Sequence, residues 1–302
     1  MLMHDSGDPI TTFSIVGYDP QGPSWGIAIA SRFLAVGGQT CWGSPRAGVI
    51  VVQAHLNTHH GRDGIPLLQE GLSADEVMAQ LLARDVEPSM RQTAIIDSRG
   101  GVATHTGGDC TPWAGGVSGR YCAAQGNMLL HSAGCEAMVE HFESSSGSLA
   151  RRLVDALTVG DEMGGDFRGR QAAALYVIRP PFVEPSPSVT EPVINLRVDD
   201  NENPFSELAR LLDLWELVYE PATSEERLSP DAPTVRRYQR VLARLGYYDG
   251  QPDGILDHAS LAALSKLAVM QNYRRRLANP EAWLDQRLLR HFEAKLGLSQ
   301  EG

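Results

Sequence analysis

Lysine and long hydrophobic runs are both scarce in this chain of 302 residues. Lys266 and Lys295 are the only lysines, so no lysine is available as a catalytic base before Lys266. No run approaches the roughly 18 apolar residues of a membrane span, and the first residues lack the apolar core of a secretory signal. These absences predict a cytoplasmic protein without a membrane partner.

Cysteine is sparse, and its spacing excludes the common paired motifs. None of the four cysteines forms a C-x-x-C pair, which argues against a zinc knuckle or a redox dithiol. Without a secretory signal, we expect buried free thiols rather than disulfides. The four are Cys41, Cys110, Cys122 and Cys135.

Charge is distributed unevenly along the chain. The formal net charge is −11, yet from Asp231 to Gly302 there are 11 Lys and Arg against 8 Asp and Glu. The remaining residues therefore carry 15 basic against 29 acidic side chains. An acidic main body argues against nucleic acid as a partner.

Residues 12 to about 200 alternate β-prone runs with helical stretches. TFSIVGY and WGIAIAS flank the turn residues DPQGPS, and QTAIID and GVATHTG flank SRG, so each pair predicts a hairpin. Strands that arrive as hairpins favour an α+β fold with antiparallel sheets. The run GVIVV is apolar at nearly every position and therefore needs cover on both faces. We expect four layers in the order αββα.

Other segments set the predicted boundaries. Ser73 and Glu76 predict a capping box at a helix start. The proline-rich RPPFVEPSPSVTEP predicts an irregular loop, and NPFSELARLLDLWELVYE predicts the helix that closes the first domain. We expect a leader at 1–11, a domain at 12–219, a linker at 220–233 and a small all-α domain at 234–302.

A threonine stands at the start of the first predicted strand. Its hydroxyl is a weak nucleophile until a base takes its proton, and the α-amino group of the same residue can do so if that residue is the first of the mature chain. This chemistry requires removal of the preceding residues. The alternative interpretation is structural, since threonine is common in strands.

The opening stretch resembles that of N-terminal-nucleophile (Ntn) hydrolases, in which a second strand ends in an SR-like pair near the nucleophile. A closer resemblance covers nearly all of the first 210 residues. The motifs follow the order and spacing of a bacterial family, domain of unknown function 1028, which is regarded as Ntn-hydrolase-like. They are TFSIVGYDP, WGIAIASRFLAVGG, RQTAIIDSRGGVATHTGGDC, AAQGNML, GGDFRGRQAAAL and LRVDDNENPFSELARLL.

This resemblance implies that Thr12 is the nucleophile after removal of residues 1–11, and that Ser31 and Arg32 form the SR-like pair. The chain departs from the family where Thr11 replaces the glycine that often precedes the nucleophile. Proteasome-type relatives use a lysine beside the nucleophile, and none exists here. The base must then be the freed amine of Thr12 or a histidine.

Amide side chains on two strands are candidate substrate-binding groups. Gln53, His55 and Asn57 alternate along one predicted strand, so we expect all three on one face. Gln125 and Asn127 alternate along another, and buried amides can bind a substrate carbonyl or an oxyanion. We predict Asn127 as a catalytic group and the others as substrate-binding groups. Hydrogen bonding to loop backbone is the structural alternative.

Two further segments carry polar groups. GGDFRGRQ holds Asp166, Arg168 and Gln171 before a strand, and we include Asp166 and Gln171 among the substrate-binding residues; an Asp–Arg pair that fixes a turn is the alternative.

HLNTHHGRD holds three histidines, and a helical His-x3-His would suit zinc. Gly61 and Gly64 interrupt the segment, so we expect no metal and no cofactor. The three histidines are His55, His59 and His60.

Residues 234 to 296 resemble a peptidoglycan-binding-like helical repeat, with LGYYDG and a later DG between helices. Without export the protein would not meet peptidoglycan, so an interaction or stability module is the preferred interpretation. A homo-oligomer stays open.

Three functions remain open. The first is an Ntn-type hydrolase of an amide-like bond in a small molecule. The second is a non-catalytic ligand-binding or scaffold protein with the same fold. The third is a metal-dependent hydrolase built on the histidines.

Overall fold

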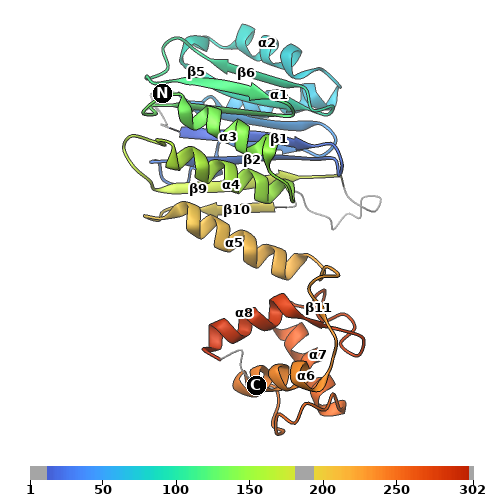
Figure 1. Ribbon diagram of the computed structural model, residues 1–302. Helices are drawn as coiled ribbons and strands as arrows, with labels where there is room; N and C mark the ends of the chain where they lie inside the picture. Colours follow the sequence, from blue (N-terminus) through green and yellow to red (C-terminus); the bar gives the residue numbers. More distant parts are fainter. Residues whose placement is uncertain (1–11, 181–193, 299–302) are drawn as a thin grey trace, which may run out of the picture. The chain divides into compact units, whose positions relative to one another are not determined.

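The computed structural model describes residues 12–180 and 194–298 (Figure 1). The predicted leader and most of the proline-rich segment lie outside these residues. Contacts divide the chain into two compact units, Met1–Arg210 and Leu211–Gly302.

The larger unit contains a six-stranded antiparallel sheet, in which β1 lies between β2 and β8. The predicted first hairpin is confirmed, with Phe13 opposite Ala30 and Tyr18 opposite Trp25. In sheet order the strands are β10 (Ile194–Val198), β9 (Ala172–Ile178), β2 (Ser24–Ser31), β1 (Thr12–Asp19), β8 (Cys122–Asn127) and β7 (Gly115–Gly119).

A second, four-stranded antiparallel sheet contains the other predicted hairpin. In sheet order its strands are β3 (Cys41–Ser44), β4 (Gly48–Ala54), β5 (Arg91–Asp97) and β6 (Val102–Thr106). Short 3-10 turns at Val36–Gly38 and Pro88–Met90 precede β3 and β5. The edge strands β3 and β7 were not predicted. Glycine, which has low strand propensity, fills three of the five positions of β7.

Helices cover the outer face of each sheet. The pair α1 (Thr58–Gln69) and α2 (Ala74–Arg84) packs on the four-stranded sheet, and α3 (Ala133–Ser144) and α4 (Leu149–Glu162) pack on the six-stranded one (Figure 1). The four-layer αββα architecture is therefore confirmed. The predicted capping box of α2 is present, with both reciprocal hydrogen bonds between Ser73 and Glu76.

Strand β4 explains why the layers form. All seven of its residues are buried. Val49 and Val51 belong to the apolar core between the sheets, whereas Ile50 and Val52 belong to the core beneath α1 and α2. Successive side chains of a strand point to opposite faces, so one apolar run joins both cores.

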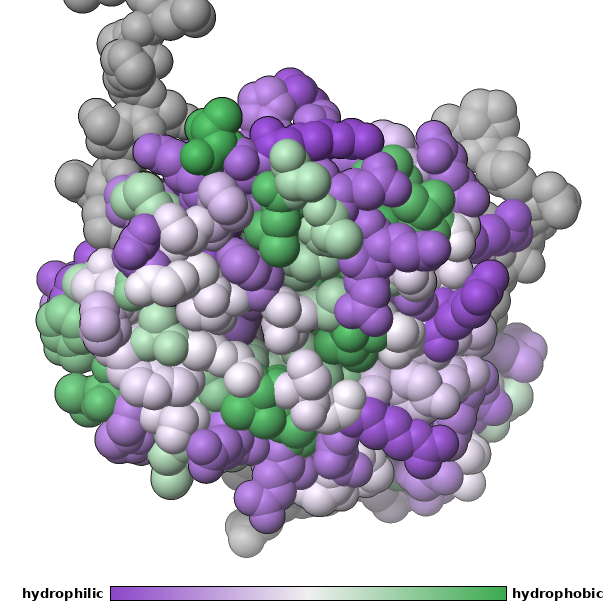
Figure 2. Space-filling model, turned by 90° about the horizontal axis from the view of Figure 1, so that it is seen from above, coloured by the Kyte–Doolittle hydropathy of each residue, from purple (hydrophilic) through white to green (hydrophobic). Residues whose placement is uncertain are grey.

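The surface of the larger unit carries both hydrophobic and hydrophilic residues. On the face in Figure 2, hydrophobic residues lie scattered among hydrophilic ones.

All four cysteines are free thiols, and burial raises the pKa of Cys122 and Cys135 to about 12. Among the described residues, no helix has both the length and the hydropathy needed to cross a bilayer.

The smaller unit is helical apart from one short ladder. An aspartate caps the start of each of its last three helices by accepting a hydrogen bond from the backbone N–H three residues later, as Asp231 does from Thr234. Its elements are α6 (Ala232–Arg244), α7 (His258–Met270), α8 (Gln286–Leu296), β11 (Arg227–Leu228) and β12 (Leu284–Asp285). Helix α5 (Pro204–Tyr219) contains the boundary between the units.

A buried arginine is central to this smaller unit. Arg276 is 1% exposed and donates to the carboxylates of Glu226 and Asp285. Asp285 also caps α8. Burial raises the pKa of Asp285, although its hydrogen bonds from the Leu288 backbone and from Arg276 oppose this shift. Pairing of this kind keeps a buried guanidinium from being isolated, which would cost several kcal/mol.

Candidate functional site

The start of β1 lies in the interior between the two sheets. Thr12 is fully buried and is paired with Asn127 of β8. The next inward position, Ser14, is opposite Gln125. Because paired residues project on the same face, these four side chains gather at one end of the six-stranded sheet.

The facing sheet contributes two glutamines to the same place. Gln53 of β4 and Gln92 of β5 are cross-strand partners, and both are buried. The hydroxyl of Ser14 donates to Gln53 Oε1 at 2.7 Å, and Gln53 Nε2 donates to the carbonyl of Thr12 at 3.2 Å. These bonds join the two sheets through polar side chains inside an otherwise apolar core.

Gln92 is the centre of the cluster. Its Oε1 accepts from Gln53 Nε2 at 2.7 Å and from Asn127 Nδ2 at 2.9 Å. Its Nε2 lies 2.8 Å from the carbonyl of Gly126 and 2.9 Å from the hydroxyl of Thr106. Gln92 was not among the predicted site residues, although a polar residue at the start of a β-prone run was a usable indication.

Three buried side-chain atoms in this cluster lack a hydrogen-bond partner among the described residues. They are Asn127 Oδ1 and both amide atoms of Gln125. Buried polar groups are nearly always paired, and an unpaired one costs about 1–3 kcal/mol. Unpaired atoms beside a strand-initial threonine make this cluster the candidate functional site. We call Thr12, Ser14, Gln53, Gln92, Gln125 and Asn127 the amide cluster.

The predicted Ser31–Arg32 pair lies at the same end of the sheet. The register that pairs Phe13 with Ala30, continued by one residue, brings Ser31 opposite Thr12, and Ser31 is buried. Arg32 is exposed, and its backbone N–H donates to Asp166 Oδ2 at 2.9 Å. Asp166 also accepts from Arg168, so the predicted Asp–Arg pair exists and holds the loop against the end of β2.

The chain turns sharply immediately after Asn127. Met128 has a φ of 52°, in the left-handed region that a residue with a side chain seldom adopts. Its carbonyl accepts from the backbone N–H of Phe167, and Leu129 forms an isolated bridge with Asp166. The end of β8 and the loop that holds Asp166 are therefore tied together.

Large apolar side chains are exposed on these tied segments. Of the six large hydrophobic residues that are exposed within the described part of the larger unit, five follow Ser31, follow Asn127 or flank Asp166. They are Phe33, Leu34, Leu130, Met163 and Phe167, and we call them the apolar rim. These side chains lie on segments that adjoin the ends of β2 and β8, and apolar side chains with a few polar groups are the usual lining of small-molecule sites.

Two predicted site residues lie elsewhere, and the expectation that Gln53, His55 and Asn57 share one strand face is wrong. Strand β4 ends at Ala54, whose φ of 64° turns the chain. Asn57 then caps α1 and donates to Asp85, while the backbone carbonyl of His55 accepts from Arg91. Only Gln53 reaches the amide cluster.

Gln171 precedes β9 and therefore lies at the same end of the sheet as Ser31, which pairs with Ala172. Its side chain, however, donates to Asp200. The structure thus brings Gln171 near the site by topology without directing its amide at Thr12.

The histidines do not converge. His60 is buried and contacts Thr93 and Asp85, whereas His59 is exposed beside Arg62 and Asp63. The residues that the structure describes include no group of three His, Cys, Asp or Glu side chains arranged to hold a metal ion. His55 precedes the helix, so the helical His-x3-His spacing does not arise.

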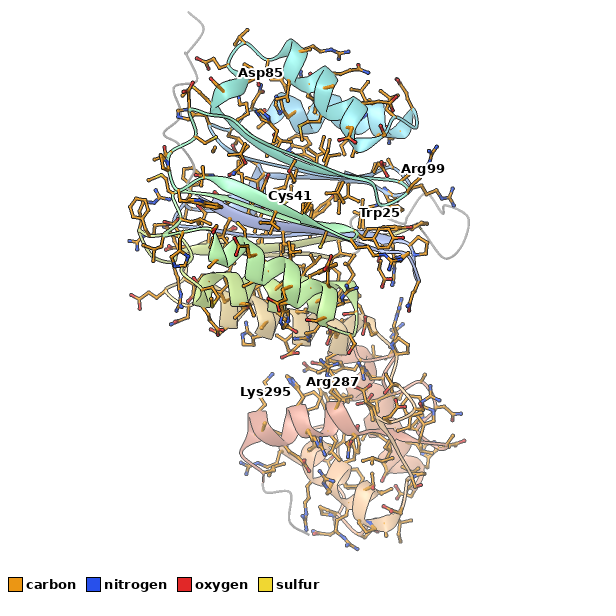
Figure 3. The ribbon with its side chains drawn as sticks, turned by 45° about the horizontal axis from the view of Figure 1, so that its top comes forward. Trp25, Cys41, Asp85, Arg99, Arg287 and Lys295 are labelled. Atoms are coloured by element: carbon orange, nitrogen blue, oxygen red, sulfur yellow. The ribbon has the colours of Figure 1, made fainter. Side chains whose placement is uncertain are left out.

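The buried cluster around Asp85 is charged and closely paired. Asp85 accepts from His60 at 2.8 Å, from Arg91 at 2.9 Å and from Asn57 at 2.7 Å. Burial opposes ionisation of Asp85, but hydrogen bonds from Arg91, from the Glu87 backbone and from Asn57 outweigh it and hold its pKa well below the usual range. Figure 3 shows Asp85 at the end of the sandwich opposite Trp25 and Arg99.

Comparison with known proteins finds two family models, which match different parts of the chain. Residues 12–208 match the model of the family of unknown function DUF1028. The chain belongs to the DUF1028 family. Residues 220–291 match a second model, described as "Putative peptidoglycan binding domain".

A solved relative agrees with this assignment. The crystal structure of a DUF1028 protein from Silicibacter pomeroyi is 29% identical to this chain with a TM-score of 0.60. The similarity covers 68% of this chain and 86% of that one. No curated protein matches the chain significantly. The DUF1028 match begins at Thr12, the residue at which β1 begins.

Proposed function

We propose that this DUF1028 protein is an Ntn-type hydrolase of an amide-like bond in a small molecule, with Thr12 as the nucleophile after removal of residues 1–11. One observation supports this most: Thr12 begins a central strand, fully buried, beside amide atoms that have no partner among the described residues.

The chemistry would proceed by acyl transfer. The freed amine of Thr12 takes the proton of the Thr12 hydroxyl as its oxygen attacks the amide carbon, and the carbonyl oxygen becomes an oxyanion. Collapse breaks the carbon–nitrogen bond, and the amine returns its proton to the leaving nitrogen. Water then cleaves the ester by the same steps, which restores Thr12 and releases the carboxylic acid.

Other residues would support these steps. Amide donors of the amide cluster suit the oxyanion, because a fixed N–H donor in a buried site stabilises charge that develops during the reaction. The guanidinium of Arg32 offers only donors and cannot serve as the base, but it suits an anionic part of a substrate. The apolar rim favours an amide that carries a large apolar substituent.

The helical C-terminal unit would then act as an interaction or stability module rather than as part of the reaction. Its hydrophobic core contains no residue of the amide cluster. A homo-oligomer formed through it stays part of the proposal.

Intact-mass spectrometry of the purified full chain tests the proposal without a known substrate. We expect a species that lacks residues 1–11, and the variant Thr12→Ala should keep them. Thr12→Ser, which retains a hydroxyl, is the matched control and should still be cut.

A library of N-acyl amides with apolar groups would then be used to find activity. A full-length mass in the wild type, together with activity that survives Thr12→Ala, would contradict the proposal. A full-length mass with no hydrolysis would instead favour the non-catalytic ligand-binding protein.

A further inference from the structure

The orientation of the Gln92 amide is fixed by its surroundings. Its Nε2 faces the backbone carbonyls of Gly126 at 2.8 Å and Gly115 at 3.2 Å, and a carbonyl oxygen can only accept. Its Oε1 must therefore face the opposite way, toward the amide nitrogens of Gln53 and Asn127. A reversed amide would set oxygen against two carbonyl oxygens.

This orientation passes to Asn127. Because Gln92 presents an oxygen, Asn127 must present its Nδ2, and its Oδ1 points away from Gln92 on the opposite side of the amide carbon. That Oδ1 is buried, and no described residue donates to it. Gln53 is fixed in the same way, since its Nε2 donates to Gln92 and to the Thr12 carbonyl while its Oε1 accepts from Ser14.

The atom that Asn127 leaves open is therefore an acceptor and needs an N–H or O–H donor. Thr12 is the direct cross-strand partner of Asn127, and paired residues of antiparallel strands have Cβ atoms roughly 4.5–5.5 Å apart. Removal of residues 1–11 would give the nitrogen of Thr12 at least one additional hydrogen. That nitrogen is the one group near Asn127 whose donor capacity changes on processing.

We infer that Asn127 Oδ1 accepts an N–H of the freed α-amino group of Thr12, and that Gln92 is the positioning residue that turns Asn127 for this contact. The inference rests on the proposed function. The contact orients the lone pair of the amine toward the Thr12 hydroxyl, from which it takes the proton.

The neutrality of the cluster matters for this role. The four amides Gln53, Gln92, Gln125 and Asn127 carry no formal charge. A carboxylate beside the amine would favour the protonated ammonium and raise its pKa, which would remove the base at neutral pH. An amide oxygen orients the amine without that penalty. Gln125 Nε2, which has no partner in the described part of the chain, is then left as the side-chain donor for the oxyanion.

The decisive measurement is the pKa of the Thr12 amine, followed by the ¹⁵N shift in protein labelled with [¹⁵N]threonine. It uses processed protein, or a chain released from a cleavable fusion so that Thr12 is its first residue. Asn127→Asp has nearly the same shape and places a carboxylate at the inferred contact, so the amine pKa should rise by about one unit or more, a tenfold change in proton affinity.

A matched control places the same charge elsewhere. Gln21 is exposed in the turn between β1 and β2, at the opposite end of β1 from Thr12, so Gln21→Glu should leave the amine pKa unchanged. Gln92→Leu serves as a second variant in case Asn127→Asp does not fold. It frees Asn127 to rotate and should also shift the amine pKa, although it lies in the facing sheet.

An amine pKa that is the same in the wild type and in whichever of these variants folds would overturn the inference. Failure of the two ideas is distinguishable. If the full chain is never cut and the released chain cleaves no amide, the hydrolase proposal fails, while the amine measurement on the released chain still decides the contact.

Discussion

Two buried polar clusters lie on opposite faces of the same strand, and they differ in how completely their atoms are paired. Thr93 of β5 faces α1, where His60, Asp85 and Arg91 form an ion-paired cluster. Gln92, one residue away, faces the other sheet and belongs to the neutral amide cluster. In the first cluster the carboxylate of Asp85 accepts from several donors, whereas the second contains amide atoms without partners among the described residues.

The completeness of hydrogen bonding distinguishes a structural cluster from a candidate functional one more clearly than the types of residue do. A His–Asp pair attracts attention in a sequence, yet here it joins α1 to the end of α2 and to β5. Glutamine and asparagine attract less attention, but their open atoms lie beside Thr12. An incomplete hydrogen-bond set is therefore the stronger reason to assign a ligand.

Among substitutions that compare the two clusters, Asp85→Ala should have the largest effect on the free energy of unfolding. It leaves Arg91 and His60 buried without their shared partner, and we expect the free energy of unfolding to fall by about 3–5 kcal/mol. Urea denaturation of the larger unit measures this. Asp63→Ala, which removes a solvent-accessible carboxylate from α1, the helix that carries His60, is the control and should have little effect. Equal effects of the two substitutions would contradict the structural role of Asp85.

Gln92→Leu should be the next largest. It removes the shared acceptor of Gln53 and Asn127 and leaves two glycine carbonyls without this donor, so we expect a loss of about 2–3 kcal/mol by the same denaturation assay. A stability equal to that of the wild type would mean that the cluster is not joined through Gln92.

The effect of Gln125→Leu on the free energy of unfolding should be opposite in sign to that of the two preceding substitutions. Since neither amide atom of Gln125 has a described partner, a leucine of similar volume should leave stability unchanged or raise it by up to about 1 kcal/mol. Under the proposed function the same variant loses hydrolysis, so stability and activity move apart. A marked loss of stability would show that Gln125 is a structural residue.

The smallest expected effect is the pH dependence of the charged cluster. Burial lowers the pKa of His60, against the opposing effect of Asp85, so the unfolded chain takes up a proton first as the pH falls. The free energy of unfolding should then decline below about pH 6.5, and further below about pH 4, where Asp85 is protonated in the unfolded state.

The difference between wild type and His60→Gln, measured by thermal unfolding across this range, isolates the first decline. The amide cluster contains no charged side chain, so the stability of Gln125→Leu should depend on pH in the same way as that of the wild type. A parallel profile for His60→Gln would contradict the assignment.

Much of this protein could be predicted from the sequence because the relevant information is local. Alternating and continuous apolar runs predicted the two hairpins and the four layers, and Ser73 and Glu76 predicted their capping box. Asn127 became a candidate through the period-two alternation of a single strand, whereas Thr12 became a candidate through the family resemblance; both site roles stay predictions. A pair between Asp166 and a nearby arginine was the structural alternative that the short motif GGDFRGRQ offered, and the structure contains it as Asp166–Arg168.

Only the tertiary structure decided which polar residues meet. The alternation of Gln53, His55 and Asn57 could not reveal that β4 ends at Ala54, because a backbone turn depends on what the following segment packs against. Gln92 entered the site through the pairing of β4 with β5 and through contact between sheets, both of which join distant residues. The sequence by itself determined the central strands and the threonine at the start of the first; the packing of one sheet on the other decided which amide atoms are paired and which are left open.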